Sequence, residues 1–215
     1  MKKTRVMALF ALALCGVIIS LQLSTTVEAA NIEVSSEKIR VFIGSTDGMT
    51  AAQANNYART QSDLLNNFVV SAPEDIGSAL ITFEAFISQH ETEALLNTVN
   101  SIDTIYMWIP NKEGRAIIDV TNNDVKGAIT NFFASLDLEN VANEDYKSDM
   151  LELMANYGIF AAEVTAEYSV LNGLTNQDSI ISVDVIYSEV AMTMADKTGK
   201  SISYICIPAK PDGTA

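Results

Sequence analysis

The sequence predicts an α+β fold, and two stretches carry this prediction. Residues 78–110 and 158–188 each show a strand pattern, then a helical pattern, then a second strand pattern. Two strand–helix–strand units in one chain of 215 residues are typical of a ferredoxin-like split βαβ sandwich. We therefore expect that domain over residues 78–215, an N-terminal strand–helix extension over 31–77, and a two-helix insertion at about 122–157.

Residues 1–30 have the pattern of a secretory signal peptide. Lys2, Lys3 and Arg5 precede the apolar run 6–23, and Val27 and Ala29 stand at the −3 and −1 positions of a cleavage site after Ala29. The alternative is an uncleaved anchor, since the run is at the lower edge of the roughly 17–25 residues that span a bilayer. In both cases we expect the protein to be exported and either secreted or associated with the cell envelope.

Charge and cysteine content exclude several functions. The formal net charge is −14, so direct binding to nucleic acid or to anionic lipid is not expected, because both depend on Lys and Arg side chains. After cleavage Cys206 is the one remaining cysteine, so no internal disulfide can form. Its apolar surroundings in 202–207 predict a small buried side chain.

The N-terminal extension contains one predicted strand and one predicted helix. Residues 31–37 are polar and are expected to lie outside regular structure. Residues 38–44 alternate and predict a strand, and residues 50–68 have helical composition. The strand is either an added edge of the main sheet or part of an independent arm.

The first strand–helix–strand unit has a well-marked helix start. Strands are predicted at 79–86 and 103–109, and a returning hairpin strand at 115–120. Ser88 and Glu91 have the spacing of a capping box. The inward face of this helix is predicted from its apolar spacing to contain Ala94, Leu95, Thr98 and Val99.

Two helical patterns predict the insertion. Asn122 or Asn123 is expected to cap the first helix, and Gly158 is expected to end the second in the left-handed conformation. Apolar residues with helical spacing define the two helices: Val125, Ala128, Ile129, Phe132, Phe133 and Leu136 in the first, and Tyr146, Met150, Leu153, Met154 and Tyr157 in the second.

The C-terminal part repeats the strand–helix–strand pattern. Strands are predicted at 159–165 and 180–187, with a helix at 168–174 between them. Residues 189–195 fit a helix or a strand, and we favour a helix with Gly199 at its end. A last strand is predicted at 201–207.

The usual catalytic and metal-binding sets are not found in the sequence. His90 is the single histidine and falls in the first turn of a predicted surface helix, where Ser88 is explained by capping, so no nucleophile–base pair is predicted. One His and one mature Cys cannot form a structural zinc site. The oxygen-rich run 119–124 lacks the glycine and the distal glutamate of a calcium loop. We therefore expect neither a metal nor a cofactor.

Tyr106 and Trp108 are the candidate binding residues. They are neighbours on one face of a predicted strand; aromatic residues in this pattern are expected in the core, but if these two are exposed together they form a contact patch. The export signal, the predicted sheet and the missing catalytic set favour a non-enzymatic binding module of the cell envelope or extracellular space that recognises a protein or peptide. Two alternatives are a carboxylate-dependent hydrolase of envelope glycans or peptides, and a structural envelope component held by an uncleaved anchor.

Overall fold

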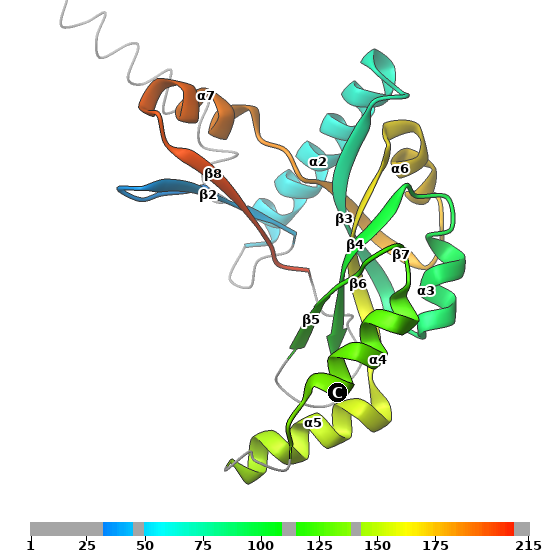
Figure 1. The fold of residues 1–215 in the computed structure, drawn as a ribbon. Coiled ribbons are helices and arrows are strands. Elements are labelled where there is room, and N and C mark those ends of the chain that lie inside the picture. Colours follow the sequence, from blue (N-terminus) through cyan, green and yellow to red (C-terminus); the bar gives the residue numbers. More distant parts are fainter. Residues whose placement is uncertain (1–31, 45–49, 109–114, 139–142, 209–215) are drawn as a thin grey trace, which may run out of the picture.

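The chain folds as a mixed α+β protein (Figure 1). The computed structural model describes residues 32–44, 50–108, 115–138 and 143–208, which form two β-sheets and six helices. The predicted signal peptide and residues 109–110 lie outside the described residues. No described helix has both the length and the apolar character needed to cross a membrane.

Every strand and helix predicted within the described residues is present, with small shifts of the ends except in the first helix of the main domain, which was predicted over 88–100 and ends at Leu95. The strands are β1 (Ile32–Val34), β2 (Lys38–Ile43), β3 (Ile76–Ile87), β4 (Ser101–Trp108), β5 (Arg115–Asp119), β6 (Gly158–Glu167), β7 (Ile180–Val185) and β8 (Ser201–Cys206). The helices are α2 (Ala51–Ser71), α3 (Gln89–Leu95), α4 (Val125–Ser135), α5 (Glu144–Asn156), α6 (Tyr168–Leu174) and α7 (Glu189–Thr198).

The larger sheet has five strands in the order β5-β4-β6-β3-β7, and all of its neighbouring strands are antiparallel. β3 and β4, which flank α3 in the chain, therefore run in the same direction with β6 between them. β6 and β7, which flank α6, likewise run in the same direction with β3 between them. β5 is left at one edge of the sheet and β7 at the other.

One face of the five-stranded sheet packs against helices. In Figure 1, α3, α4 and α6 lie on the same side of this sheet. Alternate strand residues point to this side, where Ile81, Phe83, Ile105 and Val164 are buried in the larger core. Because α4 packs against β5, the first helix of the predicted insertion lies beside an edge of the sheet.

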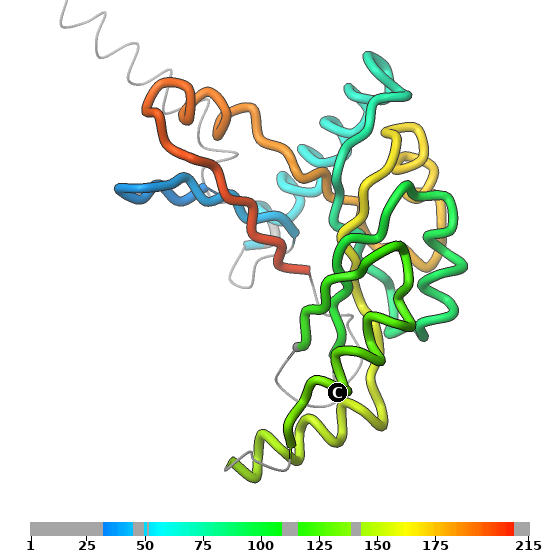
Figure 2. Tube along the Cα trace, viewed as in Figure 1, coloured from blue at the N-terminus to red at the C-terminus, as the bar shows by residue number. Residues whose placement is uncertain are grey.

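A second, three-stranded sheet joins the two ends of the described chain. Its order is β1-β2-β8, and β2 pairs with β8 in parallel from Lys38↔Ser201 to Ile43↔Cys206. Figure 2 shows these blue and red segments side by side. The N-terminal strand, for which two placements were considered, thus pairs with the last strand. β2 belongs to the predicted extension 31–77 and β8 to the predicted domain 78–215, so the pairing joins these two parts. The boundary between them stays a prediction.

The prediction that 31–37 lies outside regular structure is wrong for residues 32–34. They form β1, which pairs antiparallel with β2. The polar pattern arises because β1 is a short edge strand whose residues Glu33 and Val34 are exposed. An ion pair between Arg40 and Glu33, with 3.1 Å between nitrogen and oxygen, joins the two strands.

A smaller core lies between the three-stranded sheet and the other face of the larger sheet, and Ala191 of α7 is part of it. It contains Ile39, Val41 and Ile43 of β2 together with Leu80 and Phe160 of the larger sheet. Gly44, directly after β2, has a φ of +100° and lies against the main chain of Ile207. Leu80 of β3 also lies beside Gly44, so the two sheets are in close contact at this glycine.

Three predictions about helix ends can be compared with the structure. The capping box of Ser88 and Glu91 is confirmed, and so is a helix at 189–195 that ends at a left-handed Gly199. The prediction that Gly158 ends α5 in the left-handed conformation is wrong. The helix ends at Asn156, Tyr157 is extended, and Gly158 begins β6.

The predicted inward face of α3 is partly wrong. Val99 is buried and Leu95 packs on the core, but Ala94 and Thr98 are exposed, and Thr92 and Leu96 are buried instead. The helix ends at Leu95, so Thr98 lies beyond the regular helical spacing that the prediction assumed.

Candidate functional site

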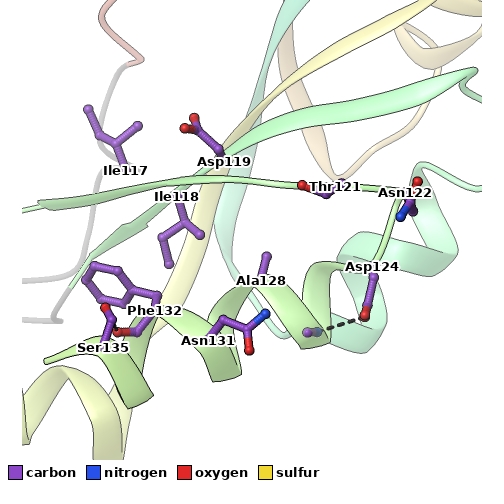
Figure 3. Close-up of a pocket in the computed structure, with 11 residues that line it drawn as sticks. Ile117, Ile118, Asp119, Thr121, Asn122, Asp124, Ala128, Asn131, Phe132 and Ser135 are labelled. Atoms are coloured by element: carbon purple, nitrogen blue, oxygen red, sulfur yellow. Dashed lines mark hydrogen bonds between the residues drawn. The ribbon is translucent and has the colours of Figure 1, made fainter.

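A groove of about 550 Å³ lies between β5 and α4 (Figure 3). Its volume is within the roughly 300–1,000 Å³ of pockets that bind small ligands. Three parts of the chain line it. β5 contributes Ile117, Ile118 and Asp119, the connection contributes Thr121, Asn122 and Asp124, and α4 contributes Gly127, Ala128, Asn131, Phe132 and Ser135.

The two faces of β5 differ, as the alternation of a strand requires. Ala116 and Ile118 are buried in the larger core. Ile117 is 50% exposed, and Asp119 is exposed as well. Figure 3 shows Ile118 pointing toward α4, whereas Ile117 and Asp119 point away from it. The groove therefore lies beside the main chain of β5. The buried side chain of Ile118 is on the side of α4, and the exposed side chains of Ile117 and Asp119 are on the other side.

The connection from β5 to α4 fixes the position of the helix. Asn122 and Asn123 adopt left-handed φ values of 56° and 58°, which Asn tolerates better than most residues. Asn123 accepts a hydrogen bond from the Ile102 main-chain nitrogen at 2.7 Å and donates one to the Asn100 carbonyl at 3.2 Å. These bonds tie the connection to the start of β4.

The predicted cap of α4 is wrong by one or two residues. Asp124 caps the helix, and its Oδ1 accepts a hydrogen bond from the Gly127 nitrogen at 2.7 Å. Asn122 and Asn123 make the turn before it instead. The groove therefore contains two exposed carboxylates, that of Asp124, which caps the helix, and that of Asp119.

The lining residues limit what the groove can do chemically. Among the described residues, the lining includes two carboxylates, several hydroxyl and amide groups and an apolar floor, but no His, Cys, Lys or Arg. Asp119 and Asp124 make the groove acidic, and Ile118, Ala128 and Phe132 offer apolar surface. This arrangement favours binding of a segment that is partly apolar and not acidic.

A second polar cluster lies under the three-stranded sheet. Asp184 is only 4% exposed and accepts a hydrogen bond from Ser182 Oγ at 2.9 Å and another from Tyr57. The Tyr57 hydroxyl also accepts a hydrogen bond from the Gly44 nitrogen at 2.7 Å. Burial raises the pKa of Asp184 to about 6, although its two hydrogen bonds act in the opposite direction.

Cys206 and Glu163 extend this cluster toward the central strands. Burial raises the pKa of the Cys206 thiol, and the neighbouring Glu163 acts in the same direction. Tyr106 donates a hydrogen bond to Glu163. A thiol in such surroundings is held in its neutral form, so the structure gives no reason to expect a reactive cysteine here.

The predicted binding residues Tyr106 and Trp108 lie on the same face of β4. Both pack edge-on against Phe160 in the smaller core, with ring centroids 6.2 and 5.9 Å away. Tyr106 is only 3% exposed and Trp108 is partly buried, so they do not form the exposed aromatic pair on which the prediction depended. Their role in binding stays a prediction.

The described residues contain no group of three or more His, Cys, Asp and Glu side chains that could hold a metal ion. His90 is exposed on α3, and Ser88 caps that helix. The structure therefore does not bring these two side chains together with a third catalytic group.

Searches of protein-family models, curated proteins and solved structures find no match to this chain.

The groove was not predicted as a binding site from the sequence, although the run 119–124 was compared with a calcium loop and Ala128 and Phe132 were placed on the apolar face of a helix. One signal was available, since 116–118 is apolar at three consecutive positions and therefore places an apolar residue on both faces of a strand. A fully buried strand has the same pattern. The order of strands in the sheet decides between the two, and here β5 lies at an edge.

Proposed function

We propose that this protein is an exported, non-enzymatic binding module of the cell envelope or extracellular space that recognises a protein or peptide through the β5–α4 groove. The observation that carries the proposal is a groove of about 550 Å³ with an apolar floor, beside an edge strand and an amphipathic helix. Grooves between an edge strand and a helix are suited to peptide segments, because main chain and side chains can both be contacted.

We further propose that the body of the protein is a ferredoxin-like split βαβ sandwich. The order β4-β6-β3-β7 within the larger sheet and the antiparallel direction of its neighbours support this assignment. On this view β5, α4 and α5 are additions to the sandwich, and the groove lies between two of them. A fold of this kind occurs in proteins with many different functions, so the proposed binding function depends on the groove and not on the fold.

The hydrolase alternative has less support. It requires two facing carboxyl groups in a concave site, one of them with a raised pKa. Asp184 has a raised pKa but is buried beneath the three-stranded sheet and does not line the groove. In the groove, the Asp124 carboxylate is already engaged by the helix.

Export is tested by N-terminal sequencing of protein recovered from cells that express the full chain. Cleavage predicts a first residue at Ala30 in the mature protein. Recovery of the intact N-terminus in a membrane fraction would instead favour the anchored structural component.

Binding is tested with a library of random peptides displayed on phage and selected on the exported protein. We expect to select peptides that bind the wild type but do not bind the variant Asn131→Trp. Asn131 is an exposed residue of the groove wall, and the indole that replaces its amide fills the groove. The matched control is Ala134→Trp, which adds the same side chain to an exposed position of α4 that does not line the groove.

The outcome is decided by comparing the two variants. No enrichment on the wild type, or enriched peptides that bind both tryptophan variants equally, would overturn the proposal. Thermal unfolding of both variants serves to show that they are folded.

A further inference from the structure

We infer that the groove takes an extended peptide segment that adds to the larger sheet as a strand beside β5, with a basic side chain next to Asp119. This inference rests on the proposed function, since it names the mode of binding and the chemical class of the partner. Three observations carry it. The main-chain groups of β5 point to the groove at alternate residues, the β7 edge of the sheet is covered whereas the β5 edge is open, and the groove is acidic.

The main-chain groups of β5 alternate between its neighbour and the groove. The Val120 nitrogen, just after β5, donates to the Asp103 carbonyl of β4 at 2.8 Å. Residues two apart in an antiparallel strand direct their main-chain groups to the same side. Ile118 and Ala116 therefore bond β4, whereas Ile117 and Asp119 direct their N–H and C=O groups to the open edge. In the part of the chain that the structure describes, β5 pairs with β4 alone.

The opposite edge of the sheet is covered by the protein itself. α2 packs against β7, and Gln61 of α2 accepts a hydrogen bond from the Val185 nitrogen at 3.0 Å. Gln61 is buried, so this edge is closed to another strand. Proteins commonly cover sheet edges because an open one pairs with other chains. An open β5 edge beside a groove is therefore suited to a partner strand.

The side chains of an added strand would meet two different surfaces. A residue opposite Ile118 directs its side chain toward α4, where Ala128 and Phe132 provide apolar contacts. A residue opposite Asp119 directs its side chain to the other face, beside the exposed carboxylate. The fitting segment thus has an apolar residue next to a basic one.

Charge supports a basic partner over an acidic one. The formal net charge of the chain is −14, and the described lining of the groove contains Asp119 and Asp124 but no Lys or Arg. The Asp124 carboxylate accepts the capping hydrogen bond from the Gly127 nitrogen, whereas Asp119 has no ion pair with another described residue, so Asp119 is the better placed of the two to pair with a ligand cation. An opposite-charge pair across two strands changes affinity by about two- to fivefold.

A second copy of this chain is the competing occupant of the edge. Two β5 strands paired antiparallel about Ile117 would set Arg115 of one copy opposite Asp119 of the other. Their Ala116 and Ile118 side chains, however, are buried in the core of their own copy and cannot fill the groove of the other. A foreign segment with free apolar side chains fits the groove better.

The mode of binding is tested by N-methylation of one of the selected peptides at each position in turn. Strand addition predicts that affinity falls about tenfold or more at every second residue, because those amides bond β5, and changes little at the residues between. A peptide that is blocked by Asn131→Trp but shows no alternation would overturn the inference and leave the proposed function standing. Absence of any binding peptide would count against both.

The role of Asp119 is tested by charge reversal on both sides. Asp119→Lys should weaken a selected basic peptide, and replacing the peptide's basic residue by Glu should restore affinity to this variant. Asp178→Lys, at an exposed position away from the groove, is the matched control. Equal effects of the two reversals would overturn the basic preference.

Sedimentation of the exported protein alone tests the second-copy alternative. We expect a monomer at micromolar concentration. A dimer that is dispersed by Asp119→Lys would show that the edge is occupied by this chain itself, and would overturn the inference.

Discussion

Asp184 is a buried carboxyl group whose protonation is coupled to folding. Its pKa is raised from 3.8 to about 6, chiefly by burial. Between these two values the folded state holds a proton that the unfolded state has lost. This contribution to stability is therefore fully present below about pH 4 and is lost as the pH rises through about 6.

Asp184→Asn should remove this dependence on pH. The variant is expected to be more stable than the wild type at pH 7, by on the order of 2–3 kcal/mol, because it no longer buries an ionised group. The two proteins should approach equal stability near pH 4. Urea unfolding of both proteins at pH 4, 5, 6 and 7 measures the difference.

A difference that is constant over this range would contradict the assignment of the pH dependence to Asp184. Tyr57, Glu163 and Cys206 are the other titratable groups of the cluster. The raised pKa values of Tyr57 and Cys206 keep both groups neutral over the range tested.

At the scale of elements, the end of β2 is closely packed against both the end of β8 and the larger sheet. A Cβ atom on Gly44 would overlap the carbonyl of Ile207 and come within 2.9 Å of the Leu80 side chain. The φ of +100° at Gly44 is also unfavourable for any other residue.

Gly44→Ala is therefore expected to destabilise the protein by at least about 2 kcal/mol, from strain in the main chain and from overpacking. Gly173→Ala is the matched control, because a Cβ atom there meets nothing within 4 Å and Gly173 lies in helix α6. The control should be neutral or slightly stabilising. Equal free energies of unfolding for the two variants would contradict the close contact at Gly44.

Elements were predictable from sequence where one local signal decides the structure. Ser88 and Glu91 mark the start of α3 because their reciprocal bonds span three residues only. Residues 168–174 form a helix with the predicted bounds. Gly158 misled the prediction because a glycine after a helix marks its end only when φ is positive, whereas here the strand begins at once.

The groove was not predictable because it depends on contacts distant in sequence. Asn123 reaches the turn geometry it needs by bonding the main chain of Ile102 and Asn100, more than twenty residues earlier. From the sequence Tyr106 fits either the core or a surface patch, and the structure decides for the core, because β2 and β8 cover that face with a second sheet. Neither strand is close to Tyr106 along the chain.

At the scale of the whole molecule, the position of each strand in its sheet should determine how fast its amide hydrogens exchange. Ile81 and Ala162 lie in strands that are paired on both sides, so their amides open only with large-scale unfolding. The amides of Ile117 and Asp119 face the open edge.

Hydrogen exchange measured by NMR should therefore be at least about a hundredfold slower for Ile81 and Ala162 than for Ile117 and Asp119. Along β5 the rate should alternate, with Ile118 slower than either neighbour because its amide bonds β4. Uniform protection of residues 117–119 would show that the edge is already covered, and would remove the basis for strand addition.

The parallel pairing of β2 with β8 has a consequence for biosynthesis. A ribosome or a translocation channel delivers residues 38–43 long before residues 201–206, so the smaller core cannot be completed until the last strand has emerged. Any chain that terminates before Ser201 leaves β2 paired with β1 alone, and leaves the core residues Ile39, Val41 and Ile43 without the cover that β8 provides. The smaller core can therefore form only after residues 201–206 have been synthesised and have paired with β2.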